Sequence, residues 1–183
     1  LYLLREMGLK VRGYEAGGDV GGTWYWNRYP GCRLDTESYT YGYFALKGII
    51  PEWTWSEHFA GQPELLRYAR HAADRMDIRK DIRFDTRVRQ ALYDEAANRW
   101  IVRLEDGGEA SCRFLLGALG PLSATRMPDI PGIESFRGQS FHSSRWPLDP
   151  DDPHGGRSYD FTGRRVGVIG TGDYFGEMAL DGG

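Results

Sequence analysis

The segment from residue 136 to 147 reads F-R-G-Q-S-F-H-S-S-R-W-P and places bulky rings and a glycine around one histidine, His142. A lone histidine beside aromatic residues is typically a packed, hydrogen-bonded residue of a loop. The sequence that follows changes the interpretation. From Arg165 to Gly172 the chain reads R-V-G-V-I-G-T-G, the pattern of a buried strand that runs into a glycine turn of the dinucleotide-binding kind.

Charge and composition exclude several classes of function. The net charge is −3 and the pI is about 5.8, so nothing favours binding to nucleic acid or to an acidic membrane surface. No apolar run approaches the roughly 20 residues that span a bilayer, and no signal peptide is present. Cys32 and Cys112 form no metal-binding or redox pair, which predicts reduced thiols in a cytoplasmic protein.

The beginning of the chain resembles the second half of a Rossmann unit. Leu1 to Met7 has helical spacing, Gly8 is placed as a helix C-cap, and Lys10 to Tyr14 reads as a short strand that ends at Glu15. In such a unit an acidic residue about 20 positions after the glycine turn binds the ribose hydroxyls. Glu15 therefore predicts a ribose ligand whose phosphate loop would lie before Leu1; a solvated turn residue is the alternative.

The segment from residue 17 to 35, G-G-D-V-G-G-T-W-Y-W-N-R-Y-P-G-C-R-L-D, fits no helical or strand period. Its glycines and tryptophans suit a backbone pressed against a planar ligand with rings walling the pocket. The whole chain carries this bias, with 25 glycines and 14% aromatic residues. An aromatic-rich structural loop is the competing interpretation.

The middle of the chain predicts packing elements. A helix is expected from Gln62 to about Met76, and four alternating segments predict an antiparallel meander. Phe114 to Leu119 is a continuous apolar run, which predicts a strand buried on both faces. The expected strands of the meander are Ile82 to Phe84, Arg87 to Tyr93, Trp100 to Leu104 and Glu109 to Cys112.

The glycine turn near the end departs from the usual G-x-G-x-x-G. It reads G-T-G-D-Y-F-G, so the third glycine comes one residue late and Asp173 puts a negative charge where a phosphate should approach. A distorted turn and an error in the last residues of the sequence are the two interpretations, and the pattern alone does not establish dinucleotide binding by this turn.

Together these patterns resemble the Baeyer–Villiger monooxygenases, which use FAD and NADPH to convert ketones into esters or lactones. The pattern F-x-G-x-x-x-H-x-x-x-W-P is the family's fingerprint, and G-G-x-W-x-x-x-x-Y-P-G-x-x-x-D, from Gly21 to Asp35, is a second family pattern. A-L-G at 118–120 stands where the family has A-T-G, a mild departure. The resemblance implies an α/β, two-dinucleotide-binding-domain flavoprotein: a FAD Rossmann-type domain with an antiparallel β-meander, then the start of an NADP Rossmann domain.

The resemblance also implies the site residues. For FAD they are Glu15, Gly21, Gly22, Thr23, Trp24, Tyr25, Trp26, Asp35, Tyr41 and Val88. For NADP they are Arg33, Leu34, Gly170, Thr171 and Gly172.

In the family, oxygen and NADPH-reduced FAD give a flavin C4a-peroxide that attacks the ketone carbonyl. The resemblance implies that Asp35 orients an arginine from a later domain, and that His142 and Trp146 of the fingerprint couple NADPH binding to domain closure. A merely packed His142 is the rival interpretation. The expected partners are O2 and a small-molecule ketone, which the resemblance suggests is a large cyclic or steroid-type ketone. The oligomeric state stays open.

The expected organisation is a partial FAD-binding domain over 1–135, the fingerprint and linker over 136–160, and the start of an NADP-binding domain over 161–183. The chain is expected to be an internal fragment without turnover of its own. Two alternatives stay open: a flavin monooxygenase that oxidises nitrogen or sulfur, and an inactive FAD-domain remnant.

Overall fold

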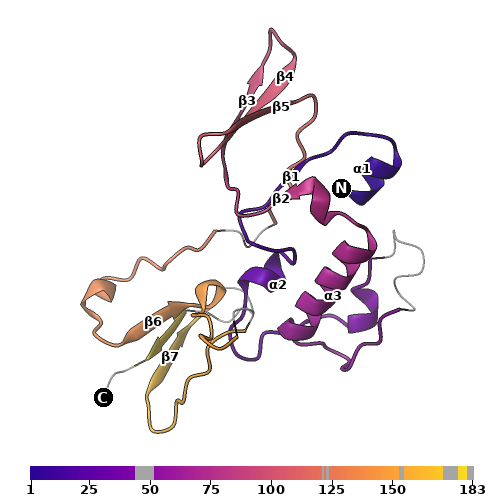
Figure 1. Ribbon diagram of the computed structural model, residues 1–183. Helices are drawn as coiled ribbons and strands as arrows, with labels where there is room; N and C mark the ends of the chain where they lie inside the picture. Colours follow the sequence, from indigo (N-terminus) through magenta and orange to yellow (C-terminus); the bar gives the residue numbers. More distant parts are fainter. Residues whose placement is uncertain (44–51, 121, 123, 153–154, 171–176, 181–183) are drawn as a thin grey trace. The chain divides into compact units, whose positions relative to one another are not determined.

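The computed structural model describes residues 1–43, 52–120, 122, 124–152, 155–170 and 177–180 (Figure 1). Its described residues form two compact units. Unit 1 comprises residues 1–20, 42–54 and 67–119, and unit 2 comprises residues 21–41, 55–66 and 120–183. Neither unit is continuous in sequence, and the boundary at residues 66 and 67 falls inside helix α3.

Unit 1 begins with the expected helix and strand. Helix α1 spans Tyr2–Glu6 and is followed by Gly8, whose φ of 78° lies in the left-handed region that suits a helix terminus. Strand β1, Gly13–Tyr14, pairs in parallel with β2, Ile82–Arg83, which follows the 3-10 helix η2, Arg79–Asp81. The first segment of the predicted meander, Ile82 to Phe84, therefore belongs to a parallel pair, and the prediction of an antiparallel partner was wrong.

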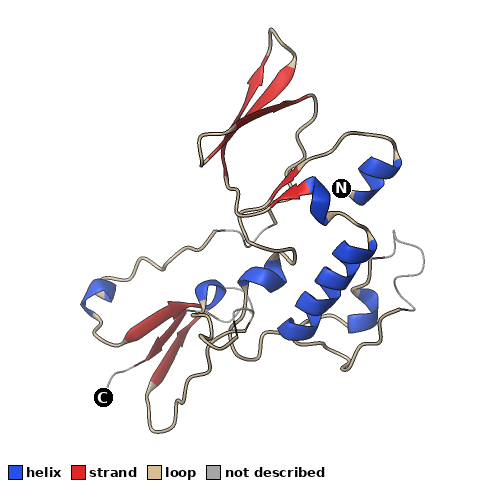
Figure 2. Ribbon diagram, viewed as in Figure 1, coloured by secondary structure: helices blue, strands red, loops and turns tan. Residues whose placement is uncertain are grey.

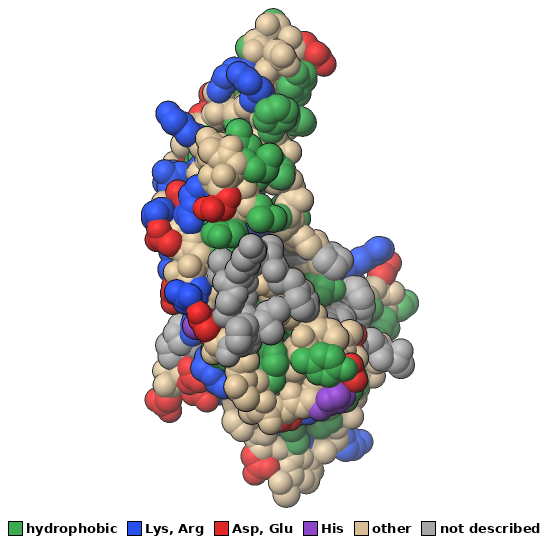
Figure 3. Space-filling model, turned by 90° about the vertical axis from the view of Figure 1, so that its right-hand side faces the viewer, with side chains coloured by type: hydrophobic (Ala, Val, Ile, Leu, Met, Phe, Trp, Pro, Cys, Tyr) green, Lys and Arg blue, Asp and Glu red, His purple; other side chains and the backbone are tan. Residues whose placement is uncertain are grey.

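The remaining three segments confirm the meander. Strands β3, Val88–Asp94, β4, Arg99–Leu104, and β5, Glu109–Cys112, form an antiparallel sheet in the order β3-β4-β5. Val102 and Leu104 are buried, whereas Leu92 and Tyr93 are exposed. Figure 3 shows hydrophobic side chains along this part of the molecule, at the top of the view, beside Lys and Arg side chains. The sheet is thus covered on only part of its surface.

Helix α3, Gln62–Arg75, is the longest helix of the described residues and confirms the expected amphipathic helix (Figure 2). Pro63 lies in its first turn, where the missing amide hydrogen costs no intrahelical bond. The buried side of the helix consists of Leu65, Leu66, Tyr68, Ala69, Ala72 and Ala73. The period-3.6 pattern was therefore a sound guide to its buried face.

Unit 2 contains short elements joined by long loops. These are helix α2, Thr23–Trp26, and the 3-10 helices η1, Ser38–Thr40, η3, Ile133–Ser135, and η4, Ser143–Arg145. Its strands are β6, Gln139–His142, β7, Val166–Ile169, and β8, Glu177–Leu180, which pair antiparallel in the order β6-β8-β7.

The apolar run from Phe114 to Leu119 corrects a second prediction. It forms no strand, and Phe114, Leu116 and Leu119 are 72%, 66% and 81% exposed. A strand covered on both faces needs neighbouring strands, and the described parallel sheet of unit 1 consists of β1 and β2 alone. The run thus finds no partner among the described residues.

A strand lies where the second Rossmann unit was predicted to start, and the rest of that unit stays a prediction. Strand β7 lies where it was expected, but its residues are exposed rather than buried. Residues 177–180 form β8, which pairs antiparallel with both β6 and β7.

Candidate functional site

The glycine turn before α2 has the geometry that its sequence predicts. Gly21 and Gly22 have φ values of 128° and 52°, which side-chain-bearing residues rarely adopt. A Cβ on Gly21 would lie 2.6 Å from Leu66 Cδ1, whereas a Cβ on Gly22 would meet nothing within 4 Å. The backbone at Gly22 thus faces open space, and the backbone at Gly21 packs on α3.

A buried cluster holds this turn and α2 in place. It contains Trp24, Cys32, Leu34, Ala60, Leu65 and Leu66, with Tyr25, Tyr29 and Trp55 packed against it. The backbone continues the attachment: the amide of Leu34 donates to the carbonyl of Ala60 at 3.0 Å, and the amide of Gln62 donates to that of Cys32 at 2.8 Å. The G-G-x-W-x-x-x-x-Y-P-G segment therefore forms a core of its own.

Trp24 is the centre of this arrangement. Its indole is 4% exposed, its Nε1 donates to the hydroxyl of Tyr41 at 3.0 Å, and the two rings meet edge to face. The carbonyl of Trp24 accepts from Nε2 of Gln62 at 2.5 Å. Trp24 and Tyr41, both predicted to contact FAD, are thus brought together, while Trp24 itself lies inside the protein.

Glu15 lies at the end of β1 and closes the turn that follows. Its Oε1 accepts from the amide of Gly17 at 2.7 Å, and its backbone carbonyl accepts from the amide of Thr86 at 2.8 Å. Glu15 thus lies at the carboxyl end of a parallel strand, and its role as a ribose ligand stays a prediction.

Asp19 joins a loop to α3 and η2, a structural role that sequence reasoning missed. Its Oδ2 accepts from Nε of Arg70 at 2.7 Å, and its Oδ1 accepts from Arg79 and from the amide of Val20. Burial alone would raise the pKa of Asp19, but the hydrogen bonds from Arg79, Val20 and Arg70 bring it below its ordinary value. No sequence signal joins these residues, since Arg70 and Arg79 come from α3 and η2.

The predicted nicotinamide-side residues, 33–35, adjoin Cys32 of the buried cluster, and Leu34 belongs to that cluster. Leu34 is buried, whereas Arg33 and Asp35 are exposed. Nη1 of Arg33 lies 3.3 Å from Oε2 of Glu57 in a solvent-exposed ion pair. The carboxylate of Asp35 is open to solvent and available to an incoming cation.

The fingerprint residues differ sharply in their surroundings. His142 ends β6, and its Nδ1 lies 2.9 Å from the Ser144 hydroxyl and 3.2 Å from the Ser144 amide. Trp146 is 4% exposed and its Nε1 donates to the carbonyl of Arg157 at 2.8 Å. Phe141 and Tyr159 pack on the Trp146 ring. His142 thus caps the following turn, and Trp146 is a buried anchor.

The other predicted residues are distributed as follows. Val88 is the first residue of β3, 39% exposed, and belongs to unit 1. Gly170 has a φ of 99°, as a glycine turn requires, and Thr171 and Gly172 lie outside the described residues. Within unit 2 the structure gathers Trp24, Tyr41 and Leu34 around one cluster.

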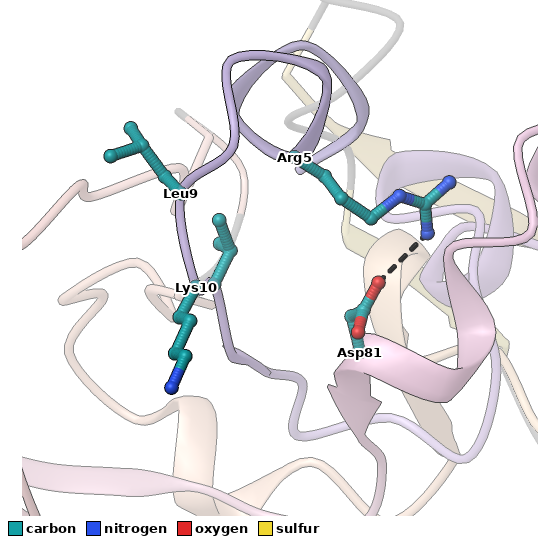
Figure 4. Close-up of a pocket in the computed structure, with 5 residues that line it drawn as sticks. Arg5, Leu9, Lys10 and Asp81 are labelled. Carbon is teal, nitrogen blue, oxygen red and sulfur yellow. Dashed lines mark hydrogen bonds and ion pairs between the residues drawn. The ribbon is translucent and has the colours of Figure 1, made fainter.

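A small cavity of unit 1, drawn in Figure 4, lies beside an ion pair that joins α1 to η2. Arg5, Leu9, Lys10, Val11 and Asp81 line it. The guanidinium of Arg5 is already engaged by Asp81 Oδ2 at 2.9 Å and by the carbonyls of Asp77 and Met76. The cavity therefore holds an ion pair that fastens α1 to η2, and we assign it no ligand. In the part of the chain that is described, no helix is long and apolar enough to cross a membrane.

Comparison with known proteins gives close relatives. No family model matches the chain. The 2-oxo-Delta(3)-4,5,5-trimethylcyclopentenylacetyl-CoA monooxygenase of Pseudomonas putida is 66% identical over 171 residues, which cover 93% of this chain and 31% of that protein. Phenazine N-monooxygenase PhzNO1 of Lysobacter antibioticus is 41% identical over 170 residues, 93% of this chain and 30% of that protein.

Solved structures agree with these relatives. The crystal structure of OTEMO in complex with FAD and NADP superposes with a TM-score of 0.86 at 65% identity, over 93% of this chain and 32% of that one. An oxidised steroid monooxygenase bound to NADP gives a TM-score of 0.79 at 51% identity, over 93% and 31% of the two chains. The chain spans about a third of the length of the proteins it matches. Over that third it has a mixed α/β fold and is similar to flavin-dependent monooxygenases that include the Baeyer–Villiger monooxygenase of Pseudooceanicola batsensis, which is 42% identical over 170 residues, 93% of this chain and 30% of that protein.

Proposed function

We propose that the chain supplies the FAD-binding part of an enzyme that oxidises cyclic ketones to esters or lactones with NADPH and O2. The observation that carries the proposal is the self-contained core around Trp24, which holds the family's glycine–tryptophan segment in a defined conformation. The 66% identity to the Pseudomonas putida monooxygenase supports a bulky cyclic ketone as substrate.

The residues present fit FAD. The positive φ at Gly22 and the open space beside its backbone allow a ligand to approach the chain closely. Glu15 at the end of β1 is placed for a ribose hydroxyl, and the aromatic residues around α2 offer flat apolar surface. We assign Gly21, Gly22, Thr23, Trp24, Tyr25, Trp26, Asp35, Tyr41 and Val88 to the FAD site with Glu15.

Bound FAD would supply electron transfer and the activation of oxygen. The chain's own residues hold and orient it: Asp35 presents an exposed carboxylate that can fix a cationic side chain beside the reacting ketone. Arg33 and Leu34 adjoin it in sequence and are assigned to the nicotinamide side. Gly170, Thr171 and Gly172 are assigned to the NADP phosphates.

His142 and Trp146 act on this site through conformation. The imidazole caps η4 and the indole is buried, so neither group is presented to a substrate as a proton donor. We infer that they couple NADPH binding to closure. The corresponding organisation has a FAD part over 1–135, the fingerprint and linker over 136–160, and the NADP part from 161. A cytoplasmic location fits this chemistry.

The test is an assay of the protein expressed from the complete reading frame that contains these residues. Incubation with NADPH, O2 and a panel of cyclic ketones, including steroid ketones, should give lactones by mass spectrometry. An enzyme that binds FAD and consumes NADPH but yields no ester or lactone would refute ketone oxidation. Asp35→Asn should abolish lactone formation, because the carboxylate that fixes the cationic side chain is lost.

A second candidate is N-oxidation, which the 41% identity to phenazine N-monooxygenase favours. The two activities differ in product, since N-oxidation adds oxygen to a nitrogen lone pair and leaves the carbon skeleton intact. The same assay with a phenazine substrate separates them. An N-oxide as the only product would favour this candidate over the first.

A further inference from the structure

The fingerprint and the cofactor segment meet inside unit 2, although more than a hundred residues separate them in sequence. The guanidinium of Arg145 lies over the ring of Trp26, with Cζ 5.2 Å from the ring centroid. Trp26 ends α2, the helix that the proposed function assigns to FAD. A cation stacked on an indole face is attractive and fixes the plane of the ring.

A second contact joins Gly156, in the linker after the fingerprint, to Arg28, which lies two residues after the end of α2. A Cβ built on Gly156 would come within 1.8 Å of the carbonyl oxygen of Arg28 and 3.0 Å of Trp146 Cδ1. Gly156 has no left-handed φ, so its requirement for glycine is steric: the backbone of 156 lies directly on the backbone of 28. Only a residue without a side chain permits this approach.

Trp146 holds the two contacts together. Its indole packs against Gly156, and its Nε1 donates to the carbonyl of Arg157 at 2.8 Å. Arg28 is itself buried and donates from Nε to the carbonyl of Tyr25 at 2.5 Å, with its guanidinium over the Tyr25 ring. The turn from Tyr25 to Arg28 is therefore rigid on one side and covered by Gly156 on the other.

We propose that Arg145, Trp146 and Gly156 form a brace that holds the end of α2 and the Asn27–Arg28 turn in the conformation that binds FAD. Arg145 and Gly156 are then positioning residues: they act on the cofactor through Trp26 and Arg28. The inference rests on the proposed function, and it gives the fingerprint a task in the FAD half of the enzyme as well as toward NADPH.

The brace is tested first without any cofactor, by amide hydrogen exchange in the protein from the complete reading frame. The reporters are the amides of Trp26 and Asn27, which donate to the carbonyls of Gly22 at 3.1 Å and Thr23 at 2.9 Å. Arg145→Ala and Gly156→Ala should both speed exchange at these amides. Arg137→Ala, which removes an exposed arginine of the same segment, should leave exchange unchanged.

The second readout is the dissociation constant for FAD. Loss of an exposed cation–π contact should weaken FAD binding about two- to fivefold in Arg145→Ala. Gly156→Ala should weaken it about tenfold or more, because the new methyl group displaces backbone from backbone. Arg145→Lys keeps the charge and should recover part of the affinity, which a general loss of folding would not allow.

The outcomes separate the two proposals. Unchanged exchange at Trp26 and Asn27 in both variants would overturn the brace, whatever the protein binds. Faster exchange with normal FAD affinity would refute its link to the cofactor. A wild-type protein that fails to bind FAD would refute the proposed function, while the exchange experiment would still decide whether the brace exists. A double-mutant cycle of Arg145→Ala with Trp26→Phe should show non-additive exchange, since the residues touch.

Discussion

Two apolar regions of this chain behave in opposite ways. The residues around Trp24 form a buried cluster, whereas the run from Phe114 to Leu119 is exposed, although it is the more continuous hydrophobic stretch. The Trp24 segment carries its own partners, because α3 and residues 55–61 return to cover it within unit 2. The Phe114 run depends on strands alongside it. Hydrophobicity alone therefore does not decide burial; the presence of a covering surface does.

The meander of unit 1 and strand β7 of unit 2 show a similar contrast between predicted and observed burial. The meander β3-β4-β5 closes by local antiparallel pairing and matches its sequence pattern closely. Strand β7 was predicted to be buried and is exposed, because burial on both faces requires layers on either side of the sheet. The local pairing of the meander follows from its sequence pattern, whereas the exposure of β7 does not.

The largest effect expected from this comparison concerns Trp24 and Phe114. Trp24→Ala removes a buried indole from a packed cluster and should lower the free energy of unfolding by about 3–5 kcal/mol. Phe114→Ala removes a side chain that is 72% exposed and should change it by less than about 0.5 kcal/mol. Urea unfolding of both variants measures the difference.

The control for this pair is Leu66→Ala, which removes a side chain that is 2% exposed from the same cluster as Trp24. It should cost about 2–5 kcal/mol. Equal losses for Trp24→Ala and Phe114→Ala would contradict the contrast, and would mean that the apolar run is covered in the folded protein.

The sequence predicted the motifs better than their contacts. The period of α3 and three strands of the meander could be predicted from the sequence, since each depends on neighbours in sequence. The burial of Trp146, the ion pairs of Asp19 and the approach of Gly156 to Arg28 could not. These contacts join segments far apart in the chain, and glycine or aspartate in a loop carries no signal of what it will meet.

A second prediction concerns Asp19, which holds the loop after Glu15 to α3 and η2. Asp19→Asn removes the charge from two hydrogen bonds to arginine and should lower the free energy of unfolding by about 1–3 kcal/mol at pH 7. Because hydrogen bonds keep the native pKa of Asp19 below its ordinary value of 3.8, its stabilisation is present above pH 3.8. It is lost as the pH falls from there through the native pKa.

The measurement is the difference in unfolding free energy between wild type and Asp19→Asn from pH 7 down to pH 3. The difference should be constant at the upper end and shrink below pH 3.8, where the carboxylate of the unfolded chain takes up a proton. Asp106→Asn is a matched control. The side chains of the Asp106–Arg83 pair are each about half exposed, so this variant should change the unfolding free energy less than Asp19→Asn does. A difference that grew on acidification would contradict the prediction, because it would mean that the native pKa of Asp19 lies above its ordinary value.

The smallest expected effect tests how much the Trp24 indole depends on the hydrogen bond that its N–H donates. Tyr41→Phe removes the hydroxyl that accepts from Trp24 Nε1 at 3.0 Å and keeps the edge-to-face ring contact. The loss should be about 1 kcal/mol, since the indole N–H loses its partner while packing is retained. Tyr39→Phe, at a tyrosine that is 59% exposed, should have no measurable effect. Thermal unfolding of both variants, with tryptophan emission as the probe, compares the two hydroxyls. If Tyr41→Phe were neutral and the emission unchanged, packing alone would hold Trp24, and the Tyr41 hydroxyl would contribute nothing to stability.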